Sequence, residues 1–221
     1  MDKKQLQNSF QRYLDKSYQY GFQAKSNSGS HDGDQEITDQ RTTSHRIDWS
    51  KLTLEPQIKH LAKGEYLFQQ GESASNLYFL CYGLVRYVSL SEEGKEFTQS
   101  FAAAPRIVGS TRAMVRQSPT LFSIEVLEDA LVLEYPWDEF YQQMSQCPNF
   151  LLTYIHLLEH LFIGKEEREN ALVKHSAERR YLDFISQFSD LEKRIPLQYI
   201  ASYIGITPVA LSRIRNRLKQ Q

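Results

Sequence analysis

The segment spanning residues 196–219 constrains the fold of this chain more than any other. It has the pattern of two short helices around a tight turn. Ala201 is small enough for helices to cross closely, and Gly205 supplies a turn residue that accepts a positive φ. Thr207 can cap the second helix, whose apolar residues recur at helical spacing beneath a polar and cationic face. That face carries Val209, Ala210, Arg213, Asn216 and Arg217. The pattern is that of a helix-turn-helix, whose second helix can lie in the DNA major groove.

Charge is distributed unevenly along the chain. Residues 174–221 contain nine Lys or Arg and four Asp or Glu, a net charge of +5, whereas the whole chain carries −1. No acidic residue follows Glu192, while Arg213, Arg215, Arg217 and Lys219 lie close to the end. An ordinary helical hairpin that binds nothing would mix both signs on its exposed face. The charge therefore favours contact with DNA phosphates over that alternative.

Length and composition exclude several classes of protein. The 221 residues suffice for one large or two small domains with a sizeable core. Apolar runs are far shorter than the roughly 18 residues of a membrane span, and the polar start does not resemble a secretory signal, so no membrane partner is expected. The two cysteines, Cys81 and Cys147, are typical of a reduced, cytoplasmic protein and are too few for an ordinary iron–sulfur cluster. We expect no metal and no cofactor.

The first two thirds of the chain divide into a polar N-terminal part and a β-rich domain. Residues 1–48 predict a short amphipathic helix followed by a flexible segment at 25–46, which has too little apolar area to order itself. Residues 49–147 contain short β-like runs with turn residues between them, including a predicted break at Glu128-Asp129. Such spacing favours a closed, jelly-roll-like antiparallel β-roll.

Residues 148–173 predict one long helix with two apolar stripes. The first stripe contains Phe150, Tyr154, Leu157 and Leu161, and the second contains Leu151, Ile155, Leu158 and Phe162. Two stripes indicate that the helix packs on its own roll with one and on a second copy of itself with the other. Tyr154, Leu157 and Leu161 are the candidate dimer contacts. Burial of the helix within one subunit remains an alternative.

These segments together predict an α+β fold. An N-terminal antiparallel β-roll is followed by a long dimerisation helix and by an all-α helix-turn-helix domain at residues 174–221. In this arrangement a further helix over residues 177–189 would seat the helix-turn-helix.

Short motifs in the roll and at the end of the chain resemble those of one known family. The roll has Gly64-Glu65, Gly71-Glu72, Gly83 and Gly94 in a running pattern, and the end reads RIPLQYIASYIGITPVALSRIRNRL. From about residue 50 onward the chain is similar to the bacterial Crp/Fnr transcription regulators. The resemblance implies a cyclic-nucleotide-binding-like roll and a homodimer that binds double-stranded DNA.

The same resemblance assigns roles to individual residues. It implies that Gln198 and Thr207 contact the DNA backbone and that positions 209, 210 and 213 face the bases. The planar guanidinium of Arg213 can bond O6 and N7 of guanine together. Val209 stands where many family members carry Glu, so contact with a thymine methyl is expected there instead. We expect Asn216 and Arg217 to lie beside them, with Arg217 on a phosphate.

The effector pocket departs from the family pattern. Members that bind cyclic AMP use a Gly-Glu pair and a later Arg-Ser/Thr-Ala run, whereas here Gly109 precedes Ser110, and the run around Thr120 has no Arg in register. A buried phosphate without a charged partner is costly, so we expect no binding of cyclic AMP. Arg112 and Arg116 would replace the missing charge only if their segment turned inward. The sequence leaves open an unidentified small-molecule effector.

Two competing functions remain to be weighed. His156, Glu159 and His160 match H-x-x-E-H, an arrangement that can hold zinc for peptide hydrolysis. Their apolar neighbours already have a packing role and no third ligand follows, so an enzyme is disfavoured. The other alternative is a β-roll module that acts through protein contacts without binding DNA. We therefore predict a cytoplasmic, homodimeric, DNA-binding transcription regulator.

Overall fold

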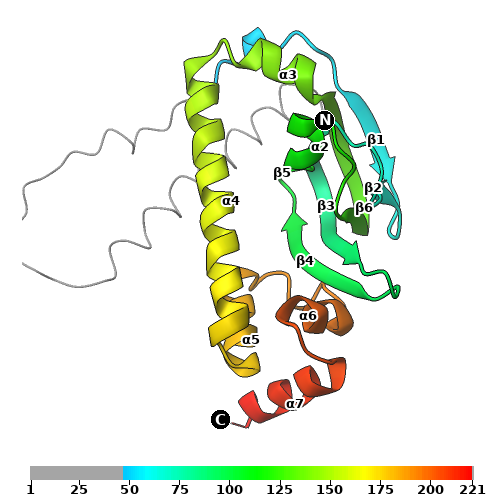
Figure 1. Cartoon of the computed structure of the whole chain (residues 1–221), viewed down its shortest axis with the longest axis vertical. Helices are drawn as coiled ribbons and strands as arrows, with labels where there is room; N and C mark the ends of the chain where they lie inside the picture. The colour runs from blue at the N-terminus through cyan, green and yellow to red at the C-terminus, as the bar shows by residue number, and fades with distance from the viewer. Residues whose placement is uncertain (1–46, 221) are drawn as a thin grey trace, which may run out of the picture.

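The computed structural model describes residues 47–220, so the predicted helix and polar segment of residues 1–46 lie outside it. Figure 1 shows a β-roll that lies beside the long helix α4 (Pro148–Lys174), with three shorter helices gathered at one end. No helix among the described residues is long and apolar enough to cross a membrane.

One antiparallel sheet of six strands forms the roll, as the sequence predicted. Its path runs β1-β6-β3-β4, with β2 paired to β6 and β5 paired to β3. The strands are β1 (Gln57–Leu61), β2 (Tyr66–Phe68), β3 (Asn76–Leu90), β4 (Glu96–Ala103), β5 (Arg106–Val108) and β6 (Ser123–Pro136).

The two longest strands, β3 and β6, bend together instead of breaking. The predicted break at Glu128-Asp129 is wrong, because β6 continues through it and the register with β3 shifts there instead. Gly83 lies at this bend with φ 104°. A Cβ on Gly83 would lie 2.7 Å from the backbone oxygen of Asp129, so the close approach of the two strands requires glycine.

Side chains alternate between the two faces of β3, and both faces are buried. Tyr78 and Leu80 belong to the cluster inside the roll, whereas Leu77 and Phe79 pack beneath α3 (Trp137–Met144). The strand therefore reads as an almost continuous apolar run, since a helix covers the face that would otherwise meet water. A short helix, α2 (Thr111–Arg116), precedes the loop that leads into β6.

Helix α4 packs on the roll and on α3 with its first turns, while its second half is largely exposed. Pro148 occupies the first turn, where its missing N–H costs nothing. Phe150 and Thr153 are buried near α3, but most side chains of the second half of the helix are exposed. The helix ends at His175, after which the chain turns back into the terminal helices.

The helix-turn-helix has the geometry that its sequence predicts. Ser176 caps α5 (Ala177–Gln187), and α6 (Leu197–Ile204) ends at Gly205 with φ 75°. Thr207 caps α7 (Pro208–Leu218) by accepting a hydrogen bond of 3.2 Å from the N–H of Ala210. Ala201 is fully buried, which allows α6 and α7 to cross closely. We call α5, α6 and α7, with the segments that connect them, the head.

The head does not stand apart from the roll. Leu84, Phe101 and Leu127 of the roll lie in one apolar cluster with Phe184 and Tyr203 of the head. In the structure this shared cluster seats α6 against β4.

Candidate nucleic-acid interface

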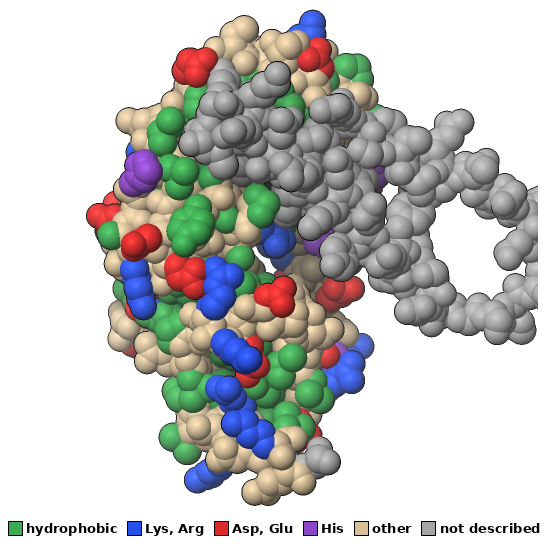
Figure 2. All heavy atoms as spheres, turned by 180° about the vertical axis from the view of Figure 1, so that it is seen from behind, with side chains coloured by type: hydrophobic (Ala, Val, Ile, Leu, Met, Phe, Trp, Pro, Cys, Tyr) green, Lys and Arg blue, Asp and Glu red, His purple; other side chains and the backbone are tan. Residues whose placement is uncertain are grey.

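The exposed face of α7 is the candidate surface for DNA. Leu211 and Ile214 are buried beneath it, and Val209 on the opposite side is 62% exposed. Figure 1 shows α7 at the end of the molecule, beyond α6. From behind, Lys and Arg side chains gather over this lower end (Figure 2). The face is thus open to a partner that approaches from outside the head.

Arg213 is placed at the centre of that face. Its side chain is exposed and forms no hydrogen bond or ion pair within residues 47–220. All of the guanidinium N–H donors are therefore available to a ligand. Asn216, one turn further on, is exposed in the same way.

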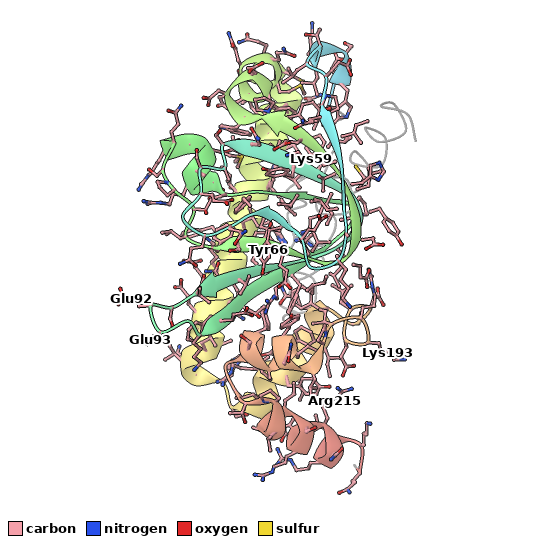
Figure 3. The ribbon with its side chains drawn as sticks, turned by 90° about the vertical axis from the view of Figure 1, so that its right-hand side faces the viewer. Lys59, Tyr66, Glu92, Glu93, Lys193 and Arg215 are labelled. Carbon is pink, nitrogen blue, oxygen red and sulfur yellow. The ribbon has the colours of Figure 1, made fainter. Side chains whose placement is uncertain are left out.

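Two other arginines of α7 are paired within the head. Arg217 forms an ion pair with Glu178, which lies in the first turn of α5. Arg215 lies 3.3 Å from the carboxylate of Glu192 and is labelled in Figure 3. Both pairs are at least partly exposed, so each stabilises the head by only about 0–1 kcal/mol. A phosphate could replace either carboxylate at little cost.

The N-termini of α6 and α7 supply neutral donors beside these cations. The hydroxyl of Thr207 accepts from Ala210 but keeps its own proton, and Thr207 is exposed. Gln198 is exposed in the first turn of α6, and Pro196 before it provides no side-chain cap. Helix N-termini with unpaired N–H groups favour anions such as phosphate.

Two residues of α7 differ in position from the expected face. Ala210 is half-buried at its edge, whereas Ser212 is exposed, and the sequence analysis did not identify it. The helical period predicts Ser212 on this face, because Ser212 lies three residues after Val209 and therefore on the same side of the helix. The exposed surface thus comprises Val209, Ser212, Arg213, Asn216 and Arg217.

Among the expected effector-pocket residues, the hydroxyl groups have structural partners. Ser110 is buried and accepts a hydrogen bond of 3.3 Å from the N–H of Ala113, which caps α2. The hydroxyl of Thr120 donates to the backbone oxygen of Gln69 at 2.8 Å. Gly109 is half-buried, and a Cβ there would lie 3.4 Å from the backbone oxygen of Asn76.

The two arginines near this pocket do not turn inward. Arg112 is exposed and its Nε donates to the backbone oxygen of Pro119 at 3.2 Å, and Arg116 is exposed on the same short helix. The interior beside α2 holds Ala113 and Val108 among other apolar side chains. Neither arginine therefore brings a positive charge into the roll.

A charged group does lie inside the roll, at a place that the sequence analysis did not identify. Glu134 is buried on β6, where it accepts from the Nδ2 of Asn76 at 2.6 Å and pairs with the Nζ of Lys59 at 2.6 Å. Burial beside this carboxylate raises the pKa of the Tyr78 hydroxyl. Figure 3 shows Lys59 on the ribbon of the roll, far from the head.

The N-terminal part of the first stripe of α4 faces its own subunit. Tyr154 stacks on Phe150 with ring centroids 6.0 Å apart and also contacts Trp137 and Tyr141. Tyr154 therefore packs within its own subunit, and its expected role in a dimer contact stays a prediction. Leu157 on this stripe is half-buried, and Leu161 is exposed.

The second stripe of α4 faces outward. Ile155 is 50% exposed and Phe162 is 64% exposed, while Leu151 and Leu158 between them are half-buried. Val173, three turns beyond Phe162, is 85% exposed, and Glu166 and Glu169 lie between them. Large apolar side chains in a row on a helix mark a surface that favours another apolar surface over water.

The residues of the zinc-like motif do not assemble a metal site. The Nδ1 of His156 lies 3.0 Å from the carboxylate of Glu159. Within residues 47–220, no three His, Cys, Asp or Glu side chains form a group that could hold a metal ion. Both cysteines are also placed unreactively: Cys147 is buried, and burial raises the pKa of the Cys81 thiol to about 11.

Comparisons with known proteins agree with this architecture. Residues 58–147 match the model of the cyclic nucleotide-binding domain. The fumarate and nitrate reduction regulatory protein of Yersinia pestis is 27% identical over 187 residues, covering 80% of this chain and 74% of that protein. The anaerobic regulatory protein of Aggregatibacter actinomycetemcomitans is 28% identical over 187 residues, covering 80% and 72%. The solved structure of the global regulator CLP of Xanthomonas campestris has the same fold, with a TM-score of 0.64 and 14% identity over 77% of this chain and 90% of that one.

Proposed function

The chain belongs to the Crp/Fnr family of transcription regulators, and from this premise we propose that it binds a near-palindromic DNA site as a homodimer. In this proposal α7 lies in the major groove and the N-termini of α6 and α7 meet the phosphate backbone. A regulator of this kind acts where the DNA is, which in a bacterium is the cytoplasm.

The open face around Arg213 is the observation that carries the proposal. Arg213 has no partner among the described residues, and Val209, Ser212 and Asn216 surround it on the exposed side of α7. We propose that Arg213 donates two hydrogen bonds to a guanine and that Val209 contacts a thymine methyl. Arg217 would then bind a phosphate in place of Glu178.

The dimer is proposed from the second stripe of α4. Ile155, Phe162 and Val173 would pack against the same residues of a second copy about a two-fold axis. Two heads held in this way would present their recognition helices about 34 Å apart, one turn of B-DNA.

We further propose that cyclic AMP is not the effector. Ser110 stands where members that bind cyclic AMP carry the Glu that binds the ribose, and the run around Thr120 has no Arg in register for the phosphate. The hydroxyls of Ser110 and Thr120 already have backbone partners, while Arg112 and Arg116 are exposed. A cyclic phosphate placed there would lose its water without gaining a cation. Calorimetry with cyclic AMP should therefore detect no binding at micromolar concentrations of the nucleotide.

Selection of binding sites from a random DNA pool tests the function. The expected product is a two-fold symmetric site, and Arg213→Ala should weaken binding to it by about 1–3 kcal/mol and relax base preference at one position in each half. Lys193→Ala is the matched control, since Lys193 is an exposed cation of the head that projects away from α7 in Figure 3.

The outcome separates the two functions that the sequence left open. If no sequence is enriched and random DNA is bound without steep dependence on salt, the protein acts through protein contacts and the proposal is wrong. If Lys193→Ala relaxes base preference as much as Arg213→Ala does, the face of α7 is not the reading surface.

A further inference from the structure

One arginine of the long helix contacts both the roll and the head. Arg168 lies in the second half of α4, and its Nη2 donates to the backbone oxygen of Tyr203 in α6 at 2.8 Å. The same nitrogen makes a longer contact of 3.4 Å with the backbone oxygen of Thr98 in β4. Its guanidinium carbon lies 3.8 Å from the centroid of the Tyr203 ring. A single side chain therefore joins three parts of the fold.

The guanidinium of Arg168 lies at the C-terminal end of α6, where a cation is favourable. The last carbonyl groups of a helix have no partner within it, and a cation there is favoured by the helix dipole. Arg168 satisfies Tyr203, and Arg180 of α5 satisfies the next carbonyl, that of Ile204, at 2.8 Å. Arg180 also donates to His175, where α4 ends, at 2.7 Å. The turn of the helix-turn-helix is thus held by arginines of both preceding helices.

A second set of contacts fixes α6 to the roll. Ser202 accepts a hydrogen bond of 2.9 Å from the N–H of Thr98. The buried guanidinium of Arg86 lies 3.6 Å from the ring centroid of Tyr199 and is oriented by Glu125, whose carboxylate accepts from its Nε at 2.7 Å. These contacts limit how α6 can tilt on the roll. Arg168 then connects α6 to α4 through its hydrogen bond to Tyr203.

We propose that Arg168 is a positioning residue that fixes the orientation of the head relative to α4 and thereby sets the spacing between the two half-sites in DNA. The proposal rests on the proposed dimer, because α4 would lie on the two-fold axis and α6 carries α7 with it. A dimer whose heads are held rigidly binds tightly to DNA with one half-site spacing. A dimer with loosened heads accepts several half-site spacings but binds the preferred one with lower affinity.

The test compares the affinity of the protein for DNA sites that differ in the spacing between their half-sites. Each base pair added between the half-sites rotates one of them by about 34–36°, since about 10–10.5 base pairs make one turn. Affinity is measured by fluorescence anisotropy for the selected site, for sites with one or two base pairs inserted, and for a single half-site. The variants are Arg168→Met, which removes all donors, and Arg168→Lys, which keeps the charge but loses the planar fork.

Lys165→Met is the matched control, because Lys165 is an exposed cation of the same helix less than one turn away. The expected result for Arg168→Met is a drop of about tenfold in the ratio of affinities for correct and shifted spacing, the size of one hydrogen bond to a charged group. Arg168→Lys should give a smaller drop. Lys165→Met should keep the original ratio, and single half-site affinity should not change in any variant.

Several outcomes overturn the proposal. A variant of Arg168 that binds more weakly but keeps the spacing ratio of the original protein shows that the arginine only stabilises the fold. Equal effects of Lys165→Met and Arg168→Met show that charge alone matters. If Arg168→Met fails to fold, an unchanged ratio in Arg168→Lys overturns the proposal in the same way. A protein that selects no DNA site contradicts the proposed function itself and is recognised before any variant is made.

Discussion

Replacing Phe101 by alanine should separate the stability of the head from that of the roll. Phe101 is 2% exposed on β4, and its ring centroid lies 6.2 Å from that of Phe184, 5.9 Å from that of Phe188 and 5.7 Å from that of Tyr203. All three partners belong to the head or its adjoining loop. Truncation of a buried Phe to Ala usually costs about 3–5 kcal/mol, a range that already includes the loss of its ring contacts. We expect about 4 kcal/mol of lost unfolding free energy.

Two optical signals can follow this change in a urea titration. Both tryptophans of the chain, Trp49 and Trp137, lie in the cluster of the roll beneath α3, so their fluorescence reports on the roll. Circular dichroism at the helix band reports mostly on α4 and the head. In the unaltered protein the two transitions should coincide, as expected for one cooperative unit. In Phe101→Ala the helix signal should change at lower urea than the fluorescence.

Phe97→Ala is the control for this experiment. Phe97 lies on the same strand but is 44% exposed, so its loss should cost less than about 1 kcal/mol and leave both transitions together. The reasoning is refuted if Phe101→Ala costs less than about 1 kcal/mol, or if its two signals still coincide.

Three further substitutions test separate parts of the structure. Gly83→Ala should lower the free energy of unfolding by more than about 2 kcal/mol in thermal denaturation, because φ 104° is strained for alanine and its Cβ would meet Asp129, whereas Gly94→Ala meets nothing and should cost less. The hydrogen bond from Arg194 lowers the pKa of the Glu128 carboxyl below its ordinary 4.5. The contribution of this pair to the free energy of unfolding is therefore present above that pH and is lost as the pH falls through the folded-state pKa. The difference in unfolding free energy between Glu128→Gln and the original protein should therefore be below about 1 kcal/mol at neutral pH and shrink as the pH falls through the folded-state pKa of Glu128. Glu178→Gln should raise affinity for random DNA about two- to fivefold in anisotropy titrations at low salt, since it frees Arg217, while Glu166→Gln on α4 should have a smaller effect.

The parts of the fold that the sequence predicted depend on interactions between near neighbours. Gly205 ends α6 and Thr207 caps α7 because a positive φ and a side-chain cap involve only three or four residues. The turn residues between the β-like runs of the roll also act over short distances. Such features can be recognised without knowing what packs against them.

The parts that the sequence did not predict depend on distant segments. The contact of Phe101 with Phe184, and that of Arg86 with Tyr199, join residues that only the folded chain brings together. The two stripes of α4 have the same helical period, so the sequence alone does not distinguish the stripe that faces inward. Only the aromatic side chains around Trp137 decide that Tyr154 faces inward and Phe162 outward.

The ion pairs of the head reduce the number of its cations that are free to contact DNA phosphates. Residues 174–221 carry +5, but Glu178 and Glu192 already pair with Arg217 and Arg215. Each phosphate contact contributes about −0.9 to the slope of log affinity against log salt, so a head with few unpaired cations binds random DNA weakly. Two such heads on the proposed dimer regain affinity at a site where both can bind, because the second binding event is intramolecular. Arg213 has no ion pair among residues 47–220, so its donors stay available to the base that we propose it contacts. Pairing the other arginines therefore lowers binding to the many competing sequences more than binding to the correct one, and this difference is what specificity requires.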